Sequence, residues 1–315
     1  MSIKVEQLKS ILDETLEILR NESAQYRPHS KDGYPGGVVL LNPNLLTCII
    51  PDLHGRQDFL LNVLSYKYQD KKILDRLQAG EIQIVCVGDG MHGESRVARR
   101  WRKAHLEYKN GFQNCPNMAE EMNENFGTMF KIMQLKVKYP GLFHFLKGNH
   151  ENILDDDQNG NHPFAKFAAE GPMTKQYVKQ FFGDLFINQW DQFEKSLPLL
   201  AIGSNYIISH ARPKMVFNIN QVINYKEHPN IIEGLTWTRD QMLQSNISKQ
   251  MLDELLDSGH TNKFWFAGHT TIKGHYKYWV DEALVQIHNP DKQSVVLIDN
   301  GVCLDLKDKF HLVSQ

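Results

Sequence analysis

The sequence of 315 residues predicts an α/β fold in which two sheets pack together and helices cover them. In the first part of the chain, short apolar runs alternate with segments of helical spacing, which indicates a parallel sheet with helices on its faces. The last part is richer in strand-like runs, and these predict a second sheet against the first. Five of the apolar runs end abruptly in polar residues. Because ligands of open α/β sheets bind beyond the carboxyl ends of the strands, we expect the functional site there.

The N-terminal segment predicts an amphipathic helix followed by a loop. Apolar residues recur at helical spacing over residues 1–20, whereas residues 21–37 are polar and contain proline and glycine. No linker, internal repeat or low-complexity tract divides the chain. We therefore expect residues 1–37 to pack on a single main domain that comprises residues 38–315. A helix that binds a partner is the alternative for the N-terminus.

Predicted strands and helices then alternate along the chain. Helices are expected over 118–138 and over most of 58–77, with a charged break near Asp70, and residues 155–196 begin acidic and continue as helix. The predicted strands are 38–41, 46–50, 82–87, 142–146, 199–202, 206–208, 264–267, 283–288 and 294–298. Between the early elements lies a basic and aromatic segment, 95–117, which a solvated helix face explains first and a contact surface for an anionic substrate second.

Composition and charge narrow the class of protein. Hydrophobic residues make up 41% and charged residues 23% of the chain, as in ordinary globular proteins, and no uncharged apolar run is long enough to span a membrane. The net charge of -2 gives no electrostatic reason to expect nucleic acid as a partner. The four cysteines are widely spaced, and Cys48 and Cys86 fall inside apolar runs, which favours buried thiols and a reducing cytoplasm.

Side chains able to bind metal ions gather at the predicted strand ends. The five ends carry Asp52 with His54, Asp89, Asn149 with His150, His210, and His269. Carboxylate, imidazole and amide oxygen suit divalent ions such as Mn, Fe and Zn. Asp89 lies between glycines in the central run, and a carboxylate there can bridge two ions that repel each other. Two ions roughly 3.5–4 Å apart can clamp the attacking and leaving oxygens of a displacement at phosphorus.

Each of these motifs alone is more often a polar turn than a site, so only their ordered combination is informative. In order, the motifs are PDLHG at 51–55, VGDG at 87–90, KGNHE at 147–151, SHARP at 209–213 and AGHT at 267–270. The combination resembles the calcineurin-like metallophosphoesterases, and more closely the phosphoprotein phosphatase family of Ser/Thr phosphatases. This resemblance implies a β-sandwich of two mixed sheets flanked by helices, with a metal site at the carboxyl ends of the strands.

The resemblance also implies a role for each matching position. One divalent ion would be held by Asp52, His54 and Asp89, and the other by Asp89, Asn149, His210 and His269. Water between the ions would be the nucleophile, His150 would protonate the leaving alkoxide, and no phosphoenzyme would form. The implied substrate is phosphoserine or phosphothreonine in a protein. A phosphatase of a small phosphoester or dinucleoside polyphosphate is one alternative, and a metal-binding scaffold with impaired catalysis is another.

The sequence departs from the family pattern after Asp89, where the family reads GDxxDRG and this chain reads GDGMHGE. His92 replaces the aspartate that pairs with the general acid, and Gly93 replaces an arginine that binds phosphate. An imidazole facing His150 cannot stabilise its protonated form as a carboxylate would. We therefore expect either that Glu94 or another acid substitutes, or that the acid step is weaker.

Two arginines are candidates to replace the lost phosphate ligand. Arg239 lies in GLTWTRD at 234–240, which resembles a Trp-x-Arg element of bacterial members of the family, and we favour it. Arg96 lies three residues after Gly93, although an exposed helix arginine explains it slightly better. The predicted catalytic residues are thus His150, Asp89 and Arg239, and the predicted phosphate-binding residues are Arg239, Asn149 and Arg96.

Overall fold

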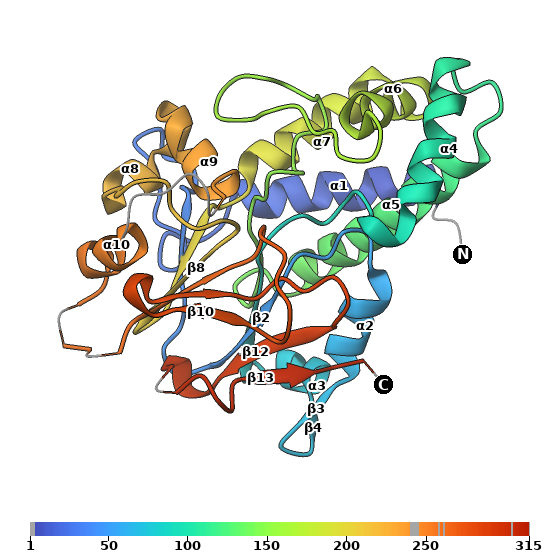
Figure 1. Ribbon diagram of the computed structural model, residues 1–315. Coiled ribbons are helices and arrows are strands. Elements are labelled where there is room, and N and C mark those ends of the chain that lie inside the picture. The colour runs from blue at the N-terminus through green and yellow to red at the C-terminus, as the bar shows by residue number, and fades with distance from the viewer. Residues whose placement is uncertain (1–3, 240–245, 258, 261, 304, 315) are drawn as a thin grey trace.

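The computed structural model describes residues 4–239, 246–257, 259–260, 262–303 and 305–314. Figure 1 shows strands at the centre, with α8, α9 and α10 gathered on one side and α1 and α4 to α7 on another. The helices are α1 (Val5–Arg20), α2 (Gln57–Ser65), α3 (Ile73–Gln78), α4 (Ala98–Lys109), α5 (Pro116–Lys138), α6 (Glu170–Phe182), α7 (Asp184–Ser196), α8 (Ile219–Ile223), α9 (Pro229–Thr236) and α10 (Ile247–Leu255).

Two mixed sheets form the centre, which confirms the predicted fold class. The five-stranded sheet has the order β13 (Phe310–Leu312), β12 (Ser294–Ile298), β2 (Leu46–Ile50), β5 (Ile82–Cys86), β6 (Phe143–Phe145). The six-stranded sheet has the order β1 (Val38–Leu40), β7 (Leu200–Ile202), β8 (Tyr206–Ser209), β9 (Phe264–Ala267), β11 (Leu284–Gln286), β10 (Lys277–Trp279). Strands β2, β5 and β6 run parallel to one another, as do β8, β9 and β11, so each group ends at one edge of its sheet.

Alternate residues of the central strands enter different cores. In β2, Cys48 and Ile50 join the core beneath α1, α2 and α5, whereas Ile49 joins the core between the sheets with Phe266 of β9. The preceding residue of β9, Trp265, packs in a third core beneath α9 and α10. Both faces of these strands are therefore buried, which explains why the strands read as continuous apolar runs in the sequence.

The predicted break in the helix near Asp70 is a β-hairpin with a two-residue turn. Strands β3 (Lys67–Tyr68) and β4 (Lys71–Lys72) pair antiparallel between α2 and α3. Gln69 and Asp70 have φ of 49° and 66°, the left-handed pair that a tight hairpin turn requires.

The basic segment 95–117 contains α4, where Arg100 is largely buried against Glu120, Glu121 and Glu124 of α5. Arg99, Arg102 and Lys103 are exposed, so a solvated helix face still explains most of the charge of this segment.

A buried ion cluster connects the N-terminal segment to the rest of the chain. Glu22 pairs with Arg27 and with Lys136 of α5, and all three side chains are at most 5% exposed. Arg27 also donates to the backbone carbonyl of Ser196 at 2.6 Å. Helix α1 itself packs along α5 and α7.

All four cysteines are free thiols. Cys48, Cys86 and Cys303 are buried free thiols, as expected for the first two, and Cys115 is a free, half-buried thiol. Among the helices of the described residues, none is both long enough and apolar enough to cross a membrane.

Candidate metal centre

The six side chains predicted to bind metal lie together beyond the ends of the strands. Asp52 and His54 follow β2, Asp89 follows β5, Asn149 follows β6, His210 follows β8 and His269 follows β9. Each is at most 9% exposed. His54, Asp89 and His269 have positive φ of 45°, 52° and 58°, a costly conformation for residues other than glycine that is found preferentially at functional sites.

Two glycines permit the close approach of these strand ends. A Cβ atom at Gly148 would lie 2.2 Å from Oδ1 of Asp89, and one at Gly268 would lie 1.9 Å from Oδ1 of Asp52. Glu151 fastens β5 to β6, because its carboxylate accepts hydrogen bonds from the backbone N–H of Asp89 at 2.9 Å and of Gly148 at 2.7 Å. The glycines of the sequence motifs are therefore required by packing around the carboxylates.

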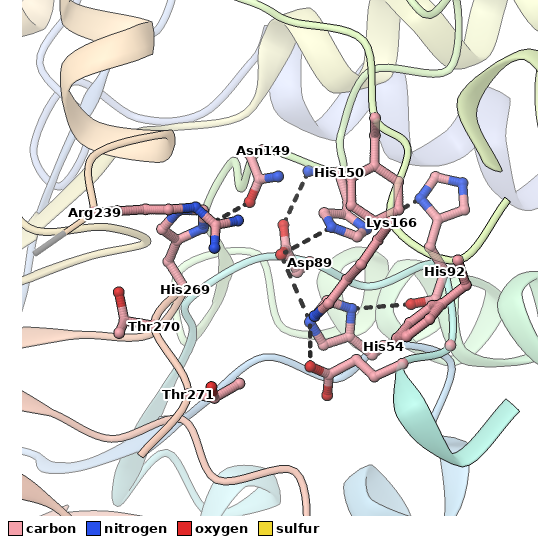
Figure 2. Close-up of a pocket in the computed structure, with 14 residues that line it drawn as sticks. His54, Asp89, His92, Asn149, His150, Lys166, Arg239, His269, Thr270 and Thr271 are labelled. Carbon is pink, nitrogen blue, oxygen red and sulfur yellow. Dashed lines mark hydrogen bonds and ion pairs between the residues drawn. The ribbon is translucent and has the colours of Figure 1, made fainter. Parts of the chain in front are cut away.

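Asp89 lies at the centre of the cluster (Figure 2). Its Oδ2 atom is 3.7 Å from Nε2 of His54, 3.8 Å from Nε2 of His150 and 3.4 Å from Nε2 of His210. Its Oδ1 atom accepts a hydrogen bond from the backbone N–H of His150 at 3.0 Å, which fixes the carboxylate. One oxygen of Asp89 therefore faces both halves of the cluster, a position that suits a bridging ligand.

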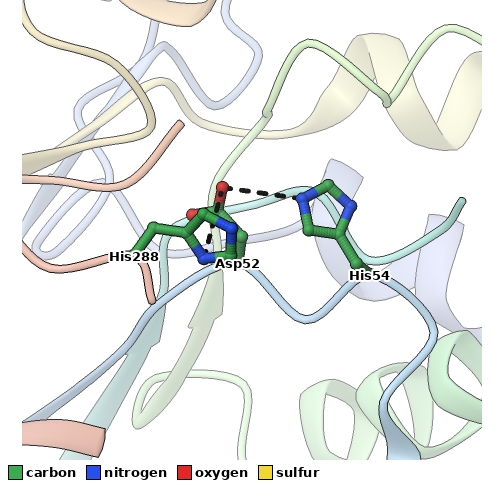
Figure 3. A group of neighbouring side chains, drawn as sticks. All are labelled: Asp52, His54 and His288. Carbon is green, nitrogen blue, oxygen red and sulfur yellow. Dashed lines mark ion pairs between the residues drawn. The ribbon is translucent and has the colours of Figure 1, made fainter. Parts of the chain in front are cut away.

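One half of the cluster combines Asp52, His54 and a histidine outside the predicted set, His288 (Figure 3). Oδ2 of Asp52 lies 3.8 Å from Nε2 of His54 and 3.9 Å from Nδ1 of His288. Nδ1 of His54 lies 3.0 Å from the backbone carbonyl oxygen of His92, so Nδ1 carries the ring proton and Nε2 presents its lone pair. Metal-binding histidines are commonly oriented in this way.

The other half combines Asn149, His210 and His269. Oδ1 of Asn149 lies 3.0 Å from Nε2 of His210 and 2.8 Å from Nδ1 of His269. Nδ1 of His210 donates to the backbone carbonyl of Val87 at 3.1 Å, so its Nε2 turns a lone pair toward Asn149 and Asp89. These electron-rich atoms converge on one point and form a donor set for a cation.

Burial governs the charge of the cluster. It lowers the pKa of His54 to about 3, and burial together with Arg239 lowers the pKa of His269 to about 3. These rings are therefore neutral near pH 7 and able to act as ligands. Burial also raises the pKa of Asp52, and it raises the pKa of Asp89 well above the usual range. Because buried carboxylates are costly without compensating charge, both the donor set and the electrostatics fit divalent ions.

His92 faces the predicted general acid, as the sequence indicated. The Nδ1 atoms of His92 and His150 lie 3.1 Å apart, and Nε2 of His92 lies 3.1 Å from the hydroxyl of Thr174. The ring centre of Phe164 is 3.7 Å from that of His150, so an aromatic wall covers the pair. Burial lowers the pKa of His92 to about 4 and that of His150 well below its usual value.

Glu94, expected as a substitute for the missing aspartate, points elsewhere. Its Oε1 atom lies 3.2 Å from Nε2 of His288 and 3.7 Å from Nε2 of His54, and its Oε2 atom lies 3.9 Å from Arg56. Among the interactions of the described residues, Glu94 forms neither a hydrogen bond nor an ion pair with His150. The sequence did not reveal this arrangement because its partner His288 comes from a distant strand.

A cleft of about 280 Å³ opens onto the cluster. His150 and Asn149 line it, with Lys166 and Phe164 from the loop before α6 and Arg239 from the segment after α9. Figure 2 shows Arg239 beside His269 on one side of Asp89, with His150 and His92 on the other. Within the described part of the chain, the guanidinium of Arg239 forms no ion pair.

Arg96, the second candidate for phosphate binding, lies against the neighbouring helix. Its guanidinium donates to Glu124 at 2.8 Å and to the backbone carbonyl of His54 at 3.2 Å. It lines a different hollow, together with Arg56 and Asp58. This placement agrees with the structural explanation of Arg96 that the sequence already favoured.

Sequence reasoning missed several residues of the site, among them His288, Phe164 and Lys166. His288 follows β11 as the other histidines follow their strands, so a polar residue at the end of the run 283–288 was a usable signal. Phe164 and Lys166 lie in a loop without a motif, and only the folded chain brings them over His150.

The fold and the site define a metallophosphoesterase: two mixed sheets flanked by helices, with a buried cluster of histidines and aspartates. The family model for calcineurin-like phosphoesterases matches residues 46–298, and the chain belongs to this family. The resemblance predicted from the sequence motifs is thereby confirmed at the level of this family. Among curated proteins, no match is found.

Three solved structures that resemble this chain are at most 16% identical to it. A Ser/Thr phosphatase from Saccharomyces cerevisiae, described as similar to human phosphatase PP5, is 16% identical, with 96% of this chain and 87% of that chain covered and a TM-score of 0.54. A cold-active protein-tyrosine phosphatase from a psychrophilic Shewanella is 16% identical, covering 84% and 78% of the two chains, with a TM-score of 0.49. A putative diadenosine tetraphosphatase is 12% identical, covering 85% and 96%, with a TM-score of 0.41. The first similarity shows a common fold, whereas the TM-scores of the other two structures are too low to support a conclusion.

Proposed function

We propose that this protein hydrolyses phosphomonoesters with two divalent ions, and that phosphoserine or phosphothreonine in proteins is its substrate. One observation carries the proposal: Oδ2 of Asp89 lies within 3.8 Å of ring nitrogens of His54, His150 and His210. A shared carboxylate oxygen between two sets of ligands is an arrangement that suits a pair of cations. The closer relation to phosphoprotein phosphatases rests on the sequence motifs.

The ligands divide into two sets that share Asp89. Asp52 and His54 complete one set, and Asn149, His210 and His269 complete the other. When bound, two divalent ions supply positive charge for the phosphate oxygens and lower the pKa of a water molecule that serves as the nucleophile. The mixture of carboxylate, amide and imidazole ligands suits Mn, Fe or Zn.

His150 is the proposed general acid. If the hydroxyl of Thr174 donates to Nε2 of His92, then Nδ1 of His92 carries a proton and donates to Nδ1 of His150. This tautomer leaves the proton of His150 on Nε2, the nitrogen that lies 3.8 Å from Asp89 and faces the cluster. The Nε2–H of His150 then points to the place where the leaving alkoxide departs and can donate a hydrogen bond to it. Full transfer of the proton requires that His150 first takes up a second proton at Nδ1, so that it returns to the neutral imidazole and not to an imidazolate.

Arg239 is the proposed phosphate ligand. It lines the cleft beside His269, whereas Arg96 is paired with Glu124 and lines another hollow. A guanidinium can contact two phosphate oxygens at once, which suits the transfer of a phosphoryl group. Lys166 lines the same cleft and adds a second positive charge for an anionic substrate.

A small phosphoester is the second candidate substrate. Phe164 covers His150, and the cleft volume of about 280 Å³ is near the lower end of ordinary ligand sites. Both features favour a compact substrate such as a free phosphomonoester over an extended protein surface.

Hydrolysis of a matched set of substrates tests the proposal, with phosphate release measured for the monoesters and nucleotide products measured for the dinucleoside tetraphosphate. Phosphoserine and phosphothreonine peptides, p-nitrophenyl phosphate and a dinucleoside tetraphosphate would be compared with Mn, Fe, Co, Ni or Zn present, and Asp89→Asn would serve as the inactive control. Preference for the peptides supports the proposal, and preference for the small molecules supports the second candidate. A protein that holds two ions yet turns over none of these substrates would be a metal-binding scaffold.

We also propose that the protein acts in the cytoplasm and that residues 1–37 pack on a single catalytic domain formed by residues 38–315. Free buried thiols agree with a reducing compartment. The pairing of Glu22 with Lys136 of α5 supports the assignment of the N-terminal segment to the domain.

A further inference from the structure

A sixth strand end reaches the metal centre. Strand β11 ends at Gln286, and His288 follows two residues later with 1% of its surface exposed. Its ring centre lies 5.4 Å from that of His54, and its Nδ1 atom lies 3.9 Å from Oδ2 of Asp52 (Figure 3). His288 was not in the predicted ligand set, and no role has been assigned to it above.

The two ring nitrogens of His288 have different surroundings. Nε2 lies 3.2 Å from Oε1 of Glu94, so it carries the ring proton and donates to that carboxylate. Nδ1 is buried and has no hydrogen-bond partner in the described structure. Buried polar atoms are normally paired, so an unpaired nitrogen that faces Asp52 requires an explanation.

Glu94 is itself held in place from two loops. Its Oε2 atom lies 3.9 Å from Arg56, and Arg56 donates to the backbone carbonyls of Asp52 at 2.7 Å and of Pro290 at 2.8 Å. Arg56 therefore connects the loop after β2 with the loop that carries His288. Glu94 lies between these loops in a position to orient the imidazole.

We infer that His288 binds, through Nδ1, the ion held by Asp52, His54 and Asp89, and that Glu94 is the positioning residue that orients it. A carboxylate that accepts the other ring proton of a ligating histidine fixes its tautomer and raises its basicity. This inference rests on the proposed dinuclear centre. It also explains the glutamate in the unusual GDGMHGE sequence, because Glu94 at the end of this motif orients the ligand His288.

The extra ligand changes the character of the first ion site. Without His288 that site has one nitrogen and two carboxylates, whereas with it the site has two nitrogens and two carboxylates. Imidazole ligands favour Zn, Fe and related ions over Mg and Ca. His288 thus acts as a determinant of which metal occupies the first site.

Two near-isosteric variants separate ligation from simple packing. In His288→Gln the terminal amide occupies the position of Nε2, so it retains the contact with Glu94 but lacks a group at Nδ1. In His288→Asn the amide occupies the position of Nδ1, so it retains a donor toward the ion but loses Glu94. Glu94→Gln tests the positioning residue. His144→Ala is the matched control, because His144 is 2% exposed and also has a buried Nδ1 without a partner, but lies outside the cluster.

The measurements are binding of Zn²⁺ and Mn²⁺ to the metal-free proteins by calorimetry, metal content, and the visible absorption of the Co²⁺-loaded proteins. We expect two ions in the wild type and in His144→Ala. His288→Gln should bind one of the two ions at least ~10-fold more weakly and change the Co²⁺ spectrum, and Glu94→Gln should lose about 10-fold for the same ion. His288→Asn should retain more of this affinity than His288→Gln.

The possible failures are distinguishable. If the wild type binds two ions and His288→Gln binds both equally tightly with an unchanged Co²⁺ spectrum, His288 is not a ligand, although the dinuclear centre stands. If His288→Gln retains affinity and His288→Asn loses it, His288 serves only to hold Glu94, and the inference is overturned. If the wild type binds fewer than two ions, the proposed function and the inference fail together. Thermal unfolding of each metal-free variant shows whether it is folded.

Discussion

Nδ1 of His92 lies 3.1 Å from Nδ1 of His150, so two buried imidazoles meet where the phosphoprotein phosphatase pattern has an imidazole and a carboxylate. No negative charge on His92 can stabilise a protonated His150. The pair can still hold His150 in one tautomer, because Thr174 contacts the far nitrogen of His92. The proposed acid step therefore lacks a supporting ion pair and depends on an oriented Nε2–H of His150 and on its transient protonation.

The leaving group tests that acid step. His150→Asn should lower kcat/KM for a phosphoserine peptide by about 10²- to 10⁴-fold, because an alkoxide needs a proton as it departs. The same variant should lose much less on p-nitrophenyl phosphate, whose leaving group is stable as an anion. Steady-state kinetics on both substrates, with metal content measured alongside, checks this. Equal losses on both would mean that His150 serves the metal centre and not the leaving group.

Arg239 and Arg96 form a matched pair for testing phosphate binding. Arg239→Ala should lower kcat/KM at least ~10-fold, because it removes a cation from the cleft, whereas Arg96→Ala should stay within about threefold, under ~1 kcal/mol. Arg239→Lys should recover part of the loss, since it restores charge without a bidentate contact. If Arg239→Ala itself stays within threefold, the phosphate ligand is another residue, and Lys166 is the next candidate.

Most of the fold could be predicted because its strands are buried on both faces. Runs such as 46–50 and 264–267 are continuous and apolar, and the structure has strands over these residues. The edge strands β10 and β13 were not predicted, because Lys277–Trp279 and Phe310–Leu312 are short and partly exposed. The helices α8, α9 and α10 were also missed, since each is short and its stability comes from packing on the six-stranded sheet.

The candidate site was predictable where a motif directly follows a strand. Asp52 and Asp89 come within three residues of the ends of β2 and β5, so their common edge follows from parallel pairing, and His210 directly follows β8 of the other sheet. The direction of Glu94 was not predictable in this way. Its partner His288 lies 194 residues away in the chain and follows a strand of the other sheet, so the two loops meet only when the two sheets pack together.

The N-terminal ion cluster predicts a pH-dependent loss of stability. Burial alone would raise the pKa of Glu22, but Lys136 and Arg27 together hold it below its usual 4.5. A lowered pKa in the folded state means that Glu22 stabilises the protein above about pH 4.5, and that this contribution is lost as the pH falls further. Glu22→Gln leaves two buried cations unpaired and should cost about 3–5 kcal/mol at pH 7.

Urea unfolding between pH 7 and pH 3 measures this difference. The gap between wild type and Glu22→Gln should be constant above about pH 5 and should narrow below pH 4.5, because the wild-type carboxyl is then protonated too. Glu17→Gln, on the exposed face of α1, is the control and should stay within about 0.5 kcal/mol. A small difference at pH 7 would show that residues 1–37 are not integral to the domain.

Removal of the metal ions should change the sign of the effect that Asp89→Asn has on stability. Without ions, burial raises the pKa of Asp89 well above its usual range, with Glu151 and Asp52 as further causes, so its ionised form is a cost at pH 7. Metal-free Asp89→Asn should therefore be at least as stable as the metal-free wild type.

With each ion at 100 times its Kd, the wild type should gain about 2.7 kcal/mol of stability per ion, whereas Asp89→Asn should gain little because both ligand sets share this carboxylate. His269→Ala belongs to one set only and should lose the gain from one ion. Thermal unfolding with and without a chelator compares the three proteins, and a full two-ion gain in Asp89→Asn would exclude Asp89 as the bridge.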